Sequence, residues 1–184
     1  MRGMHAKDGS EGADGLWLAV VSMAVVVTAS NILVQYPIND YLTYGAFTYP
    51  ASFLVTDLTT RLSGPHRARR VAWIGFALAV GLSVWLSEPR IALASGAAFI
   101  TGQLLDIAVF QRLRNQGWWQ APLASSSAGS VVDTVVFFGF AFAGTGLPVL
   151  SMMAGDLAVK LALAVVFLAP FRAVVGVALR RSPA

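Results

Sequence analysis

The sequence predicts an all-α integral membrane protein with six transmembrane helices. Of its 184 residues, 57% are hydrophobic and only 12% are charged, whereas soluble domains carry about 25% charged residues. The mean hydropathy is +0.68, and the apolar residues occur in runs that approach the roughly 20 residues a helix needs to cross a bilayer. The basic residues gather in alternate connections between these runs, as the positive-inside rule requires.

Residues 1–15 form a polar segment in which Arg2 and Lys7 stand among three acidic residues. We expect a disordered N-terminal tail here, because so polar a segment has little apolar surface to bury. A signal peptide is not predicted, since the start is not distinctly basic and the following apolar run is too long for one. Residues 16–181 then form a single six-helix transmembrane domain.

The six predicted spans follow one another with short connections. They cover residues 16–35, 45–62, 71–87, 91–113 and 124–143, with the sixth inside 149–179. The second is short and contains Pro50, which either begins the helix or kinks it, and Pro170 is expected to kink or end the last. Trp73 and Trp85 lie near the two ends of the third span, as interfacial aromatic residues do.

The basic residues predict the orientation. They are Arg61, Arg67, Arg69 and Arg70 after the second span, Arg112 and Arg114 after the fourth, and Arg180 and Arg181 after the sixth. With six spans, all of these fall on one side together with the N-terminus. The positive-inside rule makes that side cytoplasmic, so we predict that both termini are inside and that the short second segment does cross.

Polar side chains inside the spans indicate a binding site, because placing an acid in hydrocarbon costs a few kcal/mol and such residues usually serve a function. They are Thr28, Asn31, Gln35, Asp57, Thr101, Gln103, Asp106, Ser130, Asp133, Thr134, Asp156 and Lys160. Carboxylates and amides together can hydrogen-bond both edges of a small planar molecule, such as one with a guanine-like edge. The aromatic residues that could stack on its face are Tyr44, Phe47, Tyr49, Phe110 and Phe137.

Spacing along each helix separates the acids into two kinds. Asp57 and Arg61 are four residues apart, as are Asp156 and Lys160, so ion pairing on one helix face is the simpler reading of both. Asp106 and Asp133 have no cation at that spacing, which favours substrate binding or proton coupling. Gln103 shares a helical face with Asp106. For the stripe of Thr28, Asn31 and Gln35, interhelical hydrogen bonding and substrate binding have equal weight.

Several functional classes are not supported by the sequence. It contains no cysteine, and both histidines lie in polar segments, so neither a metal site nor another cofactor is expected. It has no P-loop and no HExxH or GxSxG motif, and the residues around Asp106 and Asp133 lack an intramembrane protease motif, so an enzyme is not expected. Membrane topology explains the arginine clusters, so a nucleic-acid partner is not expected either.

Six segments together resemble one known family. They are ASNILVQYP at 29–37, YGAFTYPASFLVTDLTTRLSGPHRARR at 44–70, GQLLDIAVFQRLR at 102–114, WWQAPLAS at 118–125, GSVVDTVVFF at 129–138, and the pair Asp156 and Lys160 before VVFLAPF. With these segments the chain resembles the bacterial queuosine precursor transporters, in the broader vitamin-uptake-transporter group. The resemblance covers most of the chain from the first span to the last.

The resemblance implies import of 7-cyano-7-deazaguanine across the bacterial inner membrane, with its aminomethyl analogue as the alternative or additional substrate. These guanine-like bases are precursors of queuosine in tRNA. It also implies a fold similar to the substrate-binding subunits of energy-coupling-factor transporters, in a protein that works without a dedicated ATPase. The alternative is a substrate-capturing subunit for another small vitamin-like molecule, which depends on an energising partner complex. A structural membrane protein would have no saturable ligand.

The predicted substrate-binding residues lie within the matching motifs. They are Asn31, Phe47, Tyr49, Asp57, Gln103, Asp106, Ser130, Asp133 and Lys160. We expect one of Asp106 and Asp133 to accept the amine and N1–H edge of the base, with Gln103 on its carbonyl or ring edge. Ser130 departs from the family, whose other members carry Asn there, and its shorter hydroxyl would alter recognition of the base.

The expected partners are this small molecule and membrane lipid. Ala94, Ala98 and Gly102 repeat every four residues on the fourth span. Such a small-residue face allows close packing of another helix. It would serve a homodimer and internal packing equally well.

Overall fold

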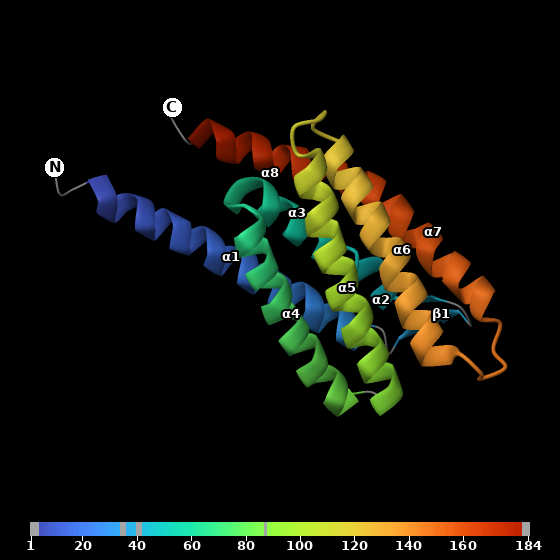
Figure 1. Ribbon diagram of the computed structural model, residues 1–184. Helices are drawn as coiled ribbons and strands as arrows, with labels where there is room; N and C mark the ends of the chain where they lie inside the picture. Colours follow the sequence, from blue (N-terminus) through green and yellow to red (C-terminus); the bar gives the residue numbers. More distant parts are fainter. Residues whose placement is uncertain (1–3, 34–35, 40–41, 87, 182–184) are drawn as a thin grey trace.

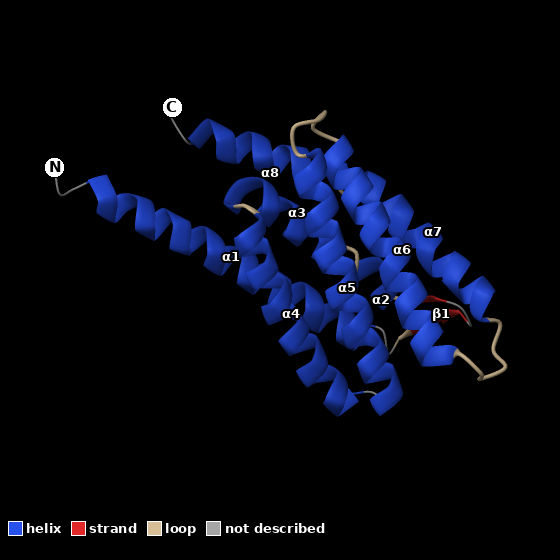
Figure 2. Cartoon of the chain, viewed as in Figure 1, coloured by secondary structure: helices blue, strands red, loops and turns tan. Residues whose placement is uncertain are grey.

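The computed structural model describes residues 4–33, 36–39, 42–86 and 88–181 (Figure 1). Apart from the connecting turns and loops, the chain within these ranges is helical, with one short antiparallel pair of strands (Figure 2). The elements in order are α1 (Met4–Leu33), β1 (Pro37–Asn39), β2 (Leu42–Thr43), α2 (Gly45–Thr48), α3 (Ala51–Ser63), α4 (Pro65–Leu86), α5 (Pro89–Leu113), α6 (Gln120–Phe142), α7 (Val149–Val166) and α8 (Leu168–Arg181).

Five helical segments among the described residues are long and apolar enough to cross a membrane. They are Gly15–Leu33, Pro65–Trp85, Pro89–Leu113, Gln120–Phe142 and Val149–Arg180. These match the first, third, fourth, fifth and sixth predicted spans, which confirms a multi-pass helical membrane protein. The last segment is divided into α7 and α8 at Phe167. Pro170 lies in the first turn of α8, where its missing N–H is tolerated. The long helix is therefore interrupted just before Pro170, as predicted.

The second predicted span is two helices, α2 and α3, separated at Tyr49 and Pro50. Pro50 has no N–H to donate, and its ring excludes the carbonyl four residues earlier, so a continuous helix cannot form through it. The 13 residues of α3 are too few to cross a bilayer alone. The buried residues of α3 are mostly polar, which the surrounding protein permits and lipid would not.

The connections of the bundle gather at two opposite ends (Figure 1). One end, here called the basic end, contains the α3–α4 turn, the α5–α6 loop and α8. There the Arg61 guanidinium donates a hydrogen bond of 2.9 Å to the carbonyl of Arg114. The other end, called the hairpin end, contains β1, β2 and the α6–α7 loop; there Arg90 donates to the carbonyls of Phe140 (2.8 Å) and Ala143 (2.6 Å).

The segment α2–α3 leads from the hairpin end to the basic end (Figure 1). This course agrees with the predicted crossing of the second segment, and the three basic connections lie at one end as six spans require. The six-span count and the cytoplasmic assignment of the basic end remain predictions. α1 begins at Met4, so residues 4–15 of the predicted disordered tail are helical in the structure, and residues 1–3 lie outside the described residues. Once a helix has formed, each further residue adds a hydrogen bond at little cost, which allows α1 to extend into a polar segment.

Helices α5 and α6 pack closely because glycine lies on both sides of their contact. A Cβ atom on Gly129 would lie 2.7 Å from Phe53 Cε1 and 3.0 Å from the carbonyl oxygen of Gly102. Ala94 and Ala98, the other members of the small-residue face on α5, are buried inside the chain. This face therefore serves internal packing.

Candidate substrate-binding cavity

A cavity of about 520 Å³ lies among α1, α2, α4, α5, α6 and α7. Its volume is in the range of pockets that hold small organic ligands. The residues that line it deep in the bundle are Val27, Ser30, Asn31, Tyr49, Ala79, Ser83, Ser95, Ala98, Phe99, Asp133, Phe137, Phe138, Asp156 and Lys160. Leu42, Glu88 and Phe142 also line it. These three lie near the hairpin end, so the cavity extends toward that end of the bundle.

One side of the cavity is formed by a buried charged network around Lys160. Its Nζ atom lies 2.7 Å from Asp133 Oδ2 and 2.5 Å from Asp156 Oδ2. Thr134 accepts a hydrogen bond of 3.1 Å from Lys160 and donates one of 2.7 Å to Asp156. Lys160 is only 4% exposed, and ion pairs this deeply buried persist only when their hydrogen bonds are satisfied.

Tyr49 holds Asp133 from a second direction. Its hydroxyl donates a hydrogen bond of 2.7 Å to Asp133 Oδ1, and its ring meets those of Phe53 and Phe99 edge-on. The break before Pro50 places Tyr49 outside any helix. A carboxylate has about four lone-pair positions. Tyr49 and Lys160 therefore fix the orientation of Asp133 and leave about two positions for a ligand in the cavity.

These contacts change the interpretation of two acids. Asp133 does have a cation, Lys160, which comes from another helix and so could not be found by spacing along α6. The predicted pair of Asp156 and Lys160 is confirmed. The predicted pair of Asp57 and Arg61 is wrong: within the described parts of the chain the ion pairs are those of Lys160.

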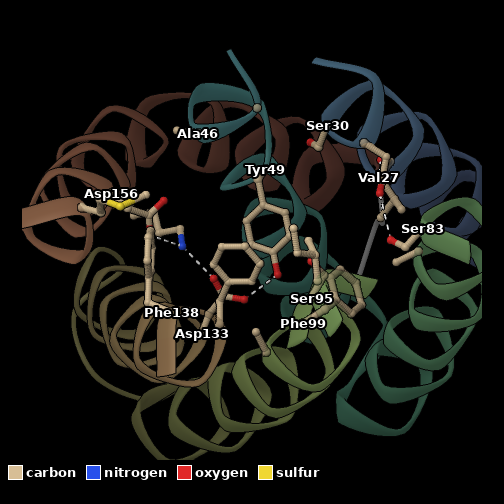
Figure 3. A pocket seen from close by; sticks show the side chains of 18 of the residues that line it. Val27, Ser30, Ala46, Tyr49, Ser83, Ser95, Phe99, Asp133, Phe138 and Asp156 are labelled. Atoms are coloured by element: carbon tan, nitrogen blue, oxygen red, sulfur yellow. Dashed lines mark hydrogen bonds and ion pairs between the residues drawn. The ribbon is translucent and has the colours of Figure 1, made fainter. Parts of the chain in front are cut away.

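Small polar groups lie on the side of the cavity facing away from this network (Figure 3). Ser83 donates a hydrogen bond of 3.2 Å to Asn31 Oδ1, and Ser30 donates one of 3.1 Å to Thr48. Tyr49 and Phe99 are between the two polar sides in this view. The cavity thus has a charged side, a neutral polar side and aromatic rings between them. Gln35, from the predicted polar stripe, lies outside the described residues.

Four of the nine predicted site residues line the cavity: Asn31, Tyr49, Asp133 and Lys160. The other five do not. They are Phe47, which is exposed, and Asp57, Gln103, Asp106 and Ser130, which are buried among α3, α5 and α6.

Gln103 instead joins α5 to α3. Its Nε2 atom donates a hydrogen bond of 2.9 Å to Ser52 Oγ, and its carbonyl oxygen accepts one from Thr56. Both hydrogen-bonding ends of its side chain are thus used inside the bundle.

Sequence reasoning missed several lining residues, including Ser83, Ser95, Phe99 and Phe138. Ser83 lies in the third span, which carries no ionisable group. That span was therefore interpreted as a scaffold helix without a part in the site. Phe99 and Phe138 have no special spacing. Asp156 was among the polar side chains that indicated a site, but ion pairing with Lys160 was its simpler interpretation, and it was not among the nine predicted substrate-binding residues.

Comparisons with known proteins agree on one family. A family model described as "Putative vitamin uptake transporter" matches residues 43–87 and 82–175, more than half of the chain. The chain is 38% identical to the "Queuosine precursor transporter" of Escherichia coli K12, over 68% of this chain and 67% of that protein. It is 38% identical to the "Probable queuosine precursor transporter" of Haemophilus influenzae, over 69% of each chain. No solved structure is significantly similar to it.

Proposed function

Because the chain belongs to the vitamin uptake transporter family, and within it to the queuosine precursor transporters, we propose that its cavity binds 7-cyano-7-deazaguanine for import. The chain is a multi-pass inner-membrane protein, and a transporter rather than an enzyme. A small-molecule substrate, a queuosine precursor, follows from the family. The identity of that precursor and the residues that hold it are the proposal.

The position of Asp133 carries the proposal. A 7-deazaguanine presents its N1–H and exocyclic amine side by side, and one carboxylate can accept both hydrogen bonds. Asp133 lines the cavity, and Tyr49 and Lys160 orient it by hydrogen bonds of 2.7 Å each. Asp106 does not line the cavity. Of the two acids considered from the sequence, the geometry therefore favours Asp133.

The remaining parts of the base meet groups of matching chemistry. Phe99 and Phe138 offer rings for its flat face, where stacking contributes about 1–3 kcal/mol per base. Its carbonyl and nitrile are hydrogen-bond acceptors. The hydroxyl groups of Ser30 and Ser83 would donate to them by turning away from Thr48 and Asn31, their partners in this structure. Gln103 is held within the bundle by Ser52 and Thr56, so we assign it a structural role.

This arrangement would reject adenine. Adenine has an unprotonated N1, whose lone pair would face the carboxylate of Asp133 in place of an N–H donor. A buried polar group left without its partner costs about 1–3 kcal/mol, and sites built on such groups discriminate strongly. The extension of the cavity to the hairpin end supports import, because the positive-inside rule places that end outside the cell.

Thermal unfolding of the purified chain in detergent tests the binding proposal. The ligands are 7-cyano-7-deazaguanine, its aminomethyl analogue, guanine, adenine and riboflavin. A ligand at 100 times its Kd stabilises the folded state by about 2.7 kcal/mol, or about 5–10 °C for a chain of this size. We expect the deazaguanines to raise the midpoint and adenine and riboflavin to leave it unchanged. A rise with riboflavin alone would contradict the proposal.

Uptake into liposomes separates a self-sufficient transporter from a subunit that needs a partner complex. We expect the purified chain alone to give saturable uptake of labelled 7-cyano-7-deazaguanine. Binding without uptake would instead favour a substrate-capturing subunit. Tyr49→Phe removes one of the two hydrogen bonds that orient Asp133, and we expect it to weaken binding about tenfold.

A further inference from the structure

A second buried polar cluster lies between the cavity and the basic end, and the binding proposal does not use it. Its acids are Asp57 on α3 and Asp106 on α5, here called the acidic pair; they are 2% and 0% exposed. Ser125 and Ser126 on α6 donate hydrogen bonds of 2.8 and 2.9 Å to the two carboxylate oxygens of Asp57. One turn further along α3, Arg61 marks the basic end by its bond to Arg114.

Asp106 has no comparable support. Neither of its carboxyl oxygens has a hydrogen-bond partner among the described residues. On the α4 side, Ala68 and Ala72 pack with Ile107, and on the α6 side a Cβ on Gly129 would lie 3.3 Å from Asp106 Cβ.

The charged groups on the helices around Asp106 are engaged elsewhere or exposed. On α3, Asp57 would repel a charge on Asp106, and Arg61 is bonded to the Arg114 carbonyl. On α6, Asp133 is paired with Lys160. On α4, Arg69 and Arg70 are exposed and Arg67 is partly exposed. No cation is therefore paired with the acidic pair in the described structure.

Ionising both of these deeply buried carboxylates at once would be costly in this closed conformation. An ionised group in an apolar site without hydrogen bonds or a counter-ion costs several kcal/mol, and proteins avoid that cost by neutralising it. Ser125 and Ser126 donate their hydrogen bonds to Asp57. Ser125 also lies near Asp106, but neither oxygen of Asp106 has a partner at hydrogen-bond geometry among the described residues. In this conformation the charge of Asp106 therefore has less hydrogen-bond support than that of Asp57.

We propose that Asp106 is a proton-binding site that couples uptake of the precursor to entry of one proton. This inference rests on the proposed transport function. On α6, Asp133, Ser130 and Ser126 follow at helical spacing and are all buried, so a polar face leads from the cavity to the acidic pair. Movement of α3 away from α5 and α6 would open this route to the basic end and expose Asp106 to water.

The transport cycle then balances one proton with one neutral substrate. Asp106 accepts a proton while the cavity faces the hairpin end, and releases it when the basic end opens. The empty chain returns with Asp106 ionised and takes its next proton from the hairpin end, by way of the emptied cavity. Substrate and proton consequently move in the same direction, and no oxidation or bond cleavage is involved.

Liposomes containing the full chain test this coupling. With the membrane voltage clamped, an outside medium more acidic by one pH unit should drive labelled 7-cyano-7-deazaguanine to about tenfold accumulation, since tenfold is the equilibrium for one proton. A trapped pH dye should report acidification inside. In Asp106→Asn we expect no accumulation above the outside concentration and no dye signal, with ligand-induced thermal stabilisation retained. Thr101→Val, an exposed change on the same helix, should behave as the unaltered protein does.

The outcomes distinguish this inference from the transport proposal. Saturable uptake that ignores the pH gradient would overturn proton coupling and leave transport intact. Uptake driven by sodium without a pH gradient would also overturn it. If the chain fails to transport, infrared difference spectroscopy still tests Asp106: the carbonyl stretch of a protonated carboxyl should be present near neutral pH and absent in Asp106→Asn. An unchanged spectrum would overturn the assignment.

Discussion

Removing the positive charge of Lys160 should be among the most destabilising single changes in this chain. In Lys160→Met the carboxylates of Asp133 and Asp156 lose the cation that lies 2.7 and 2.5 Å from them. Breaking a buried ion pair from one side costs about 3–5 kcal/mol. We expect the lower part of this range, about 3 kcal/mol. The Asp156 side chain is 14% exposed, so water can solvate part of its charge once Lys160 is removed.

The assay is thermal unfolding of the purified chain in detergent. A loss of about 3 kcal/mol corresponds to a midpoint lowered by about 6–12 °C at this chain length. Adding Asp133→Asn to Lys160→Met removes a stranded charge, so the double variant should be more stable than the sum of the single effects predicts, by at least about 1 kcal/mol. Arg180→Met removes an exposed charge and should change stability by about 0.5 kcal/mol at most. A midpoint lowered by less than about 2 °C in Lys160→Met, or additive effects of the two substitutions, would show that Lys160 does not stabilise the buried carboxylates.

Two further predictions concern the membrane orientation and the helix contact. The chain has no native cysteine, so Thr145→Cys and Gln116→Cys can be labelled singly in cells; an impermeant maleimide added outside should react at Thr145→Cys only, and the reverse pattern would contradict the predicted orientation. Gly129→Ala should destabilise the chain by about 1–3 kcal/mol, because its Cβ would meet Phe53 at 2.7 Å. Gly139→Ala, on the same helix with nothing within 4 Å, should be neutral or stabilising, and equal effects of the two in thermal unfolding would contradict the close contact.

The fold could largely be predicted from the sequence because lipid imposes a length and a polarity on each span. Hydropathy found five long spans whose cores the structure confirms, and Pro170 indicated the break between α7 and α8. The second span was harder, because Pro50 divides it and Thr56, Asp57 and Thr60 make α3 polar. Such a helix is stable only when other helices surround it, which its own sequence does not reveal.

The candidate site was predicted in part, and the misses have one physical cause. Spacing along a helix identifies neighbours on that helix, as it did for Asp156 and Lys160. It cannot show which helices meet, so the pairing of Asp133 with Lys160 and the enclosure of Gln103 by α3 required the structure. The same limit explains why Asp106 and Asp133 looked equivalent in the sequence, although only Asp133 lines the cavity.

Binding of 7-cyano-7-deazaguanine to matched aspartate variants tests whether Asp133 holds the substrate in this cavity. We would titrate the ligand into the purified chain, Asp133→Asn and Asp106→Asn in detergent, after confirming that each variant is folded. We expect Asp133→Asn to weaken binding at least about a hundredfold, since a charged hydrogen-bonding partner contributes about 3 kcal/mol, whereas Asp106→Asn should bind as the unaltered chain does. Undiminished binding by Asp133→Asn, or loss of binding only in Asp106→Asn, would contradict the assignment of this cavity as the substrate site.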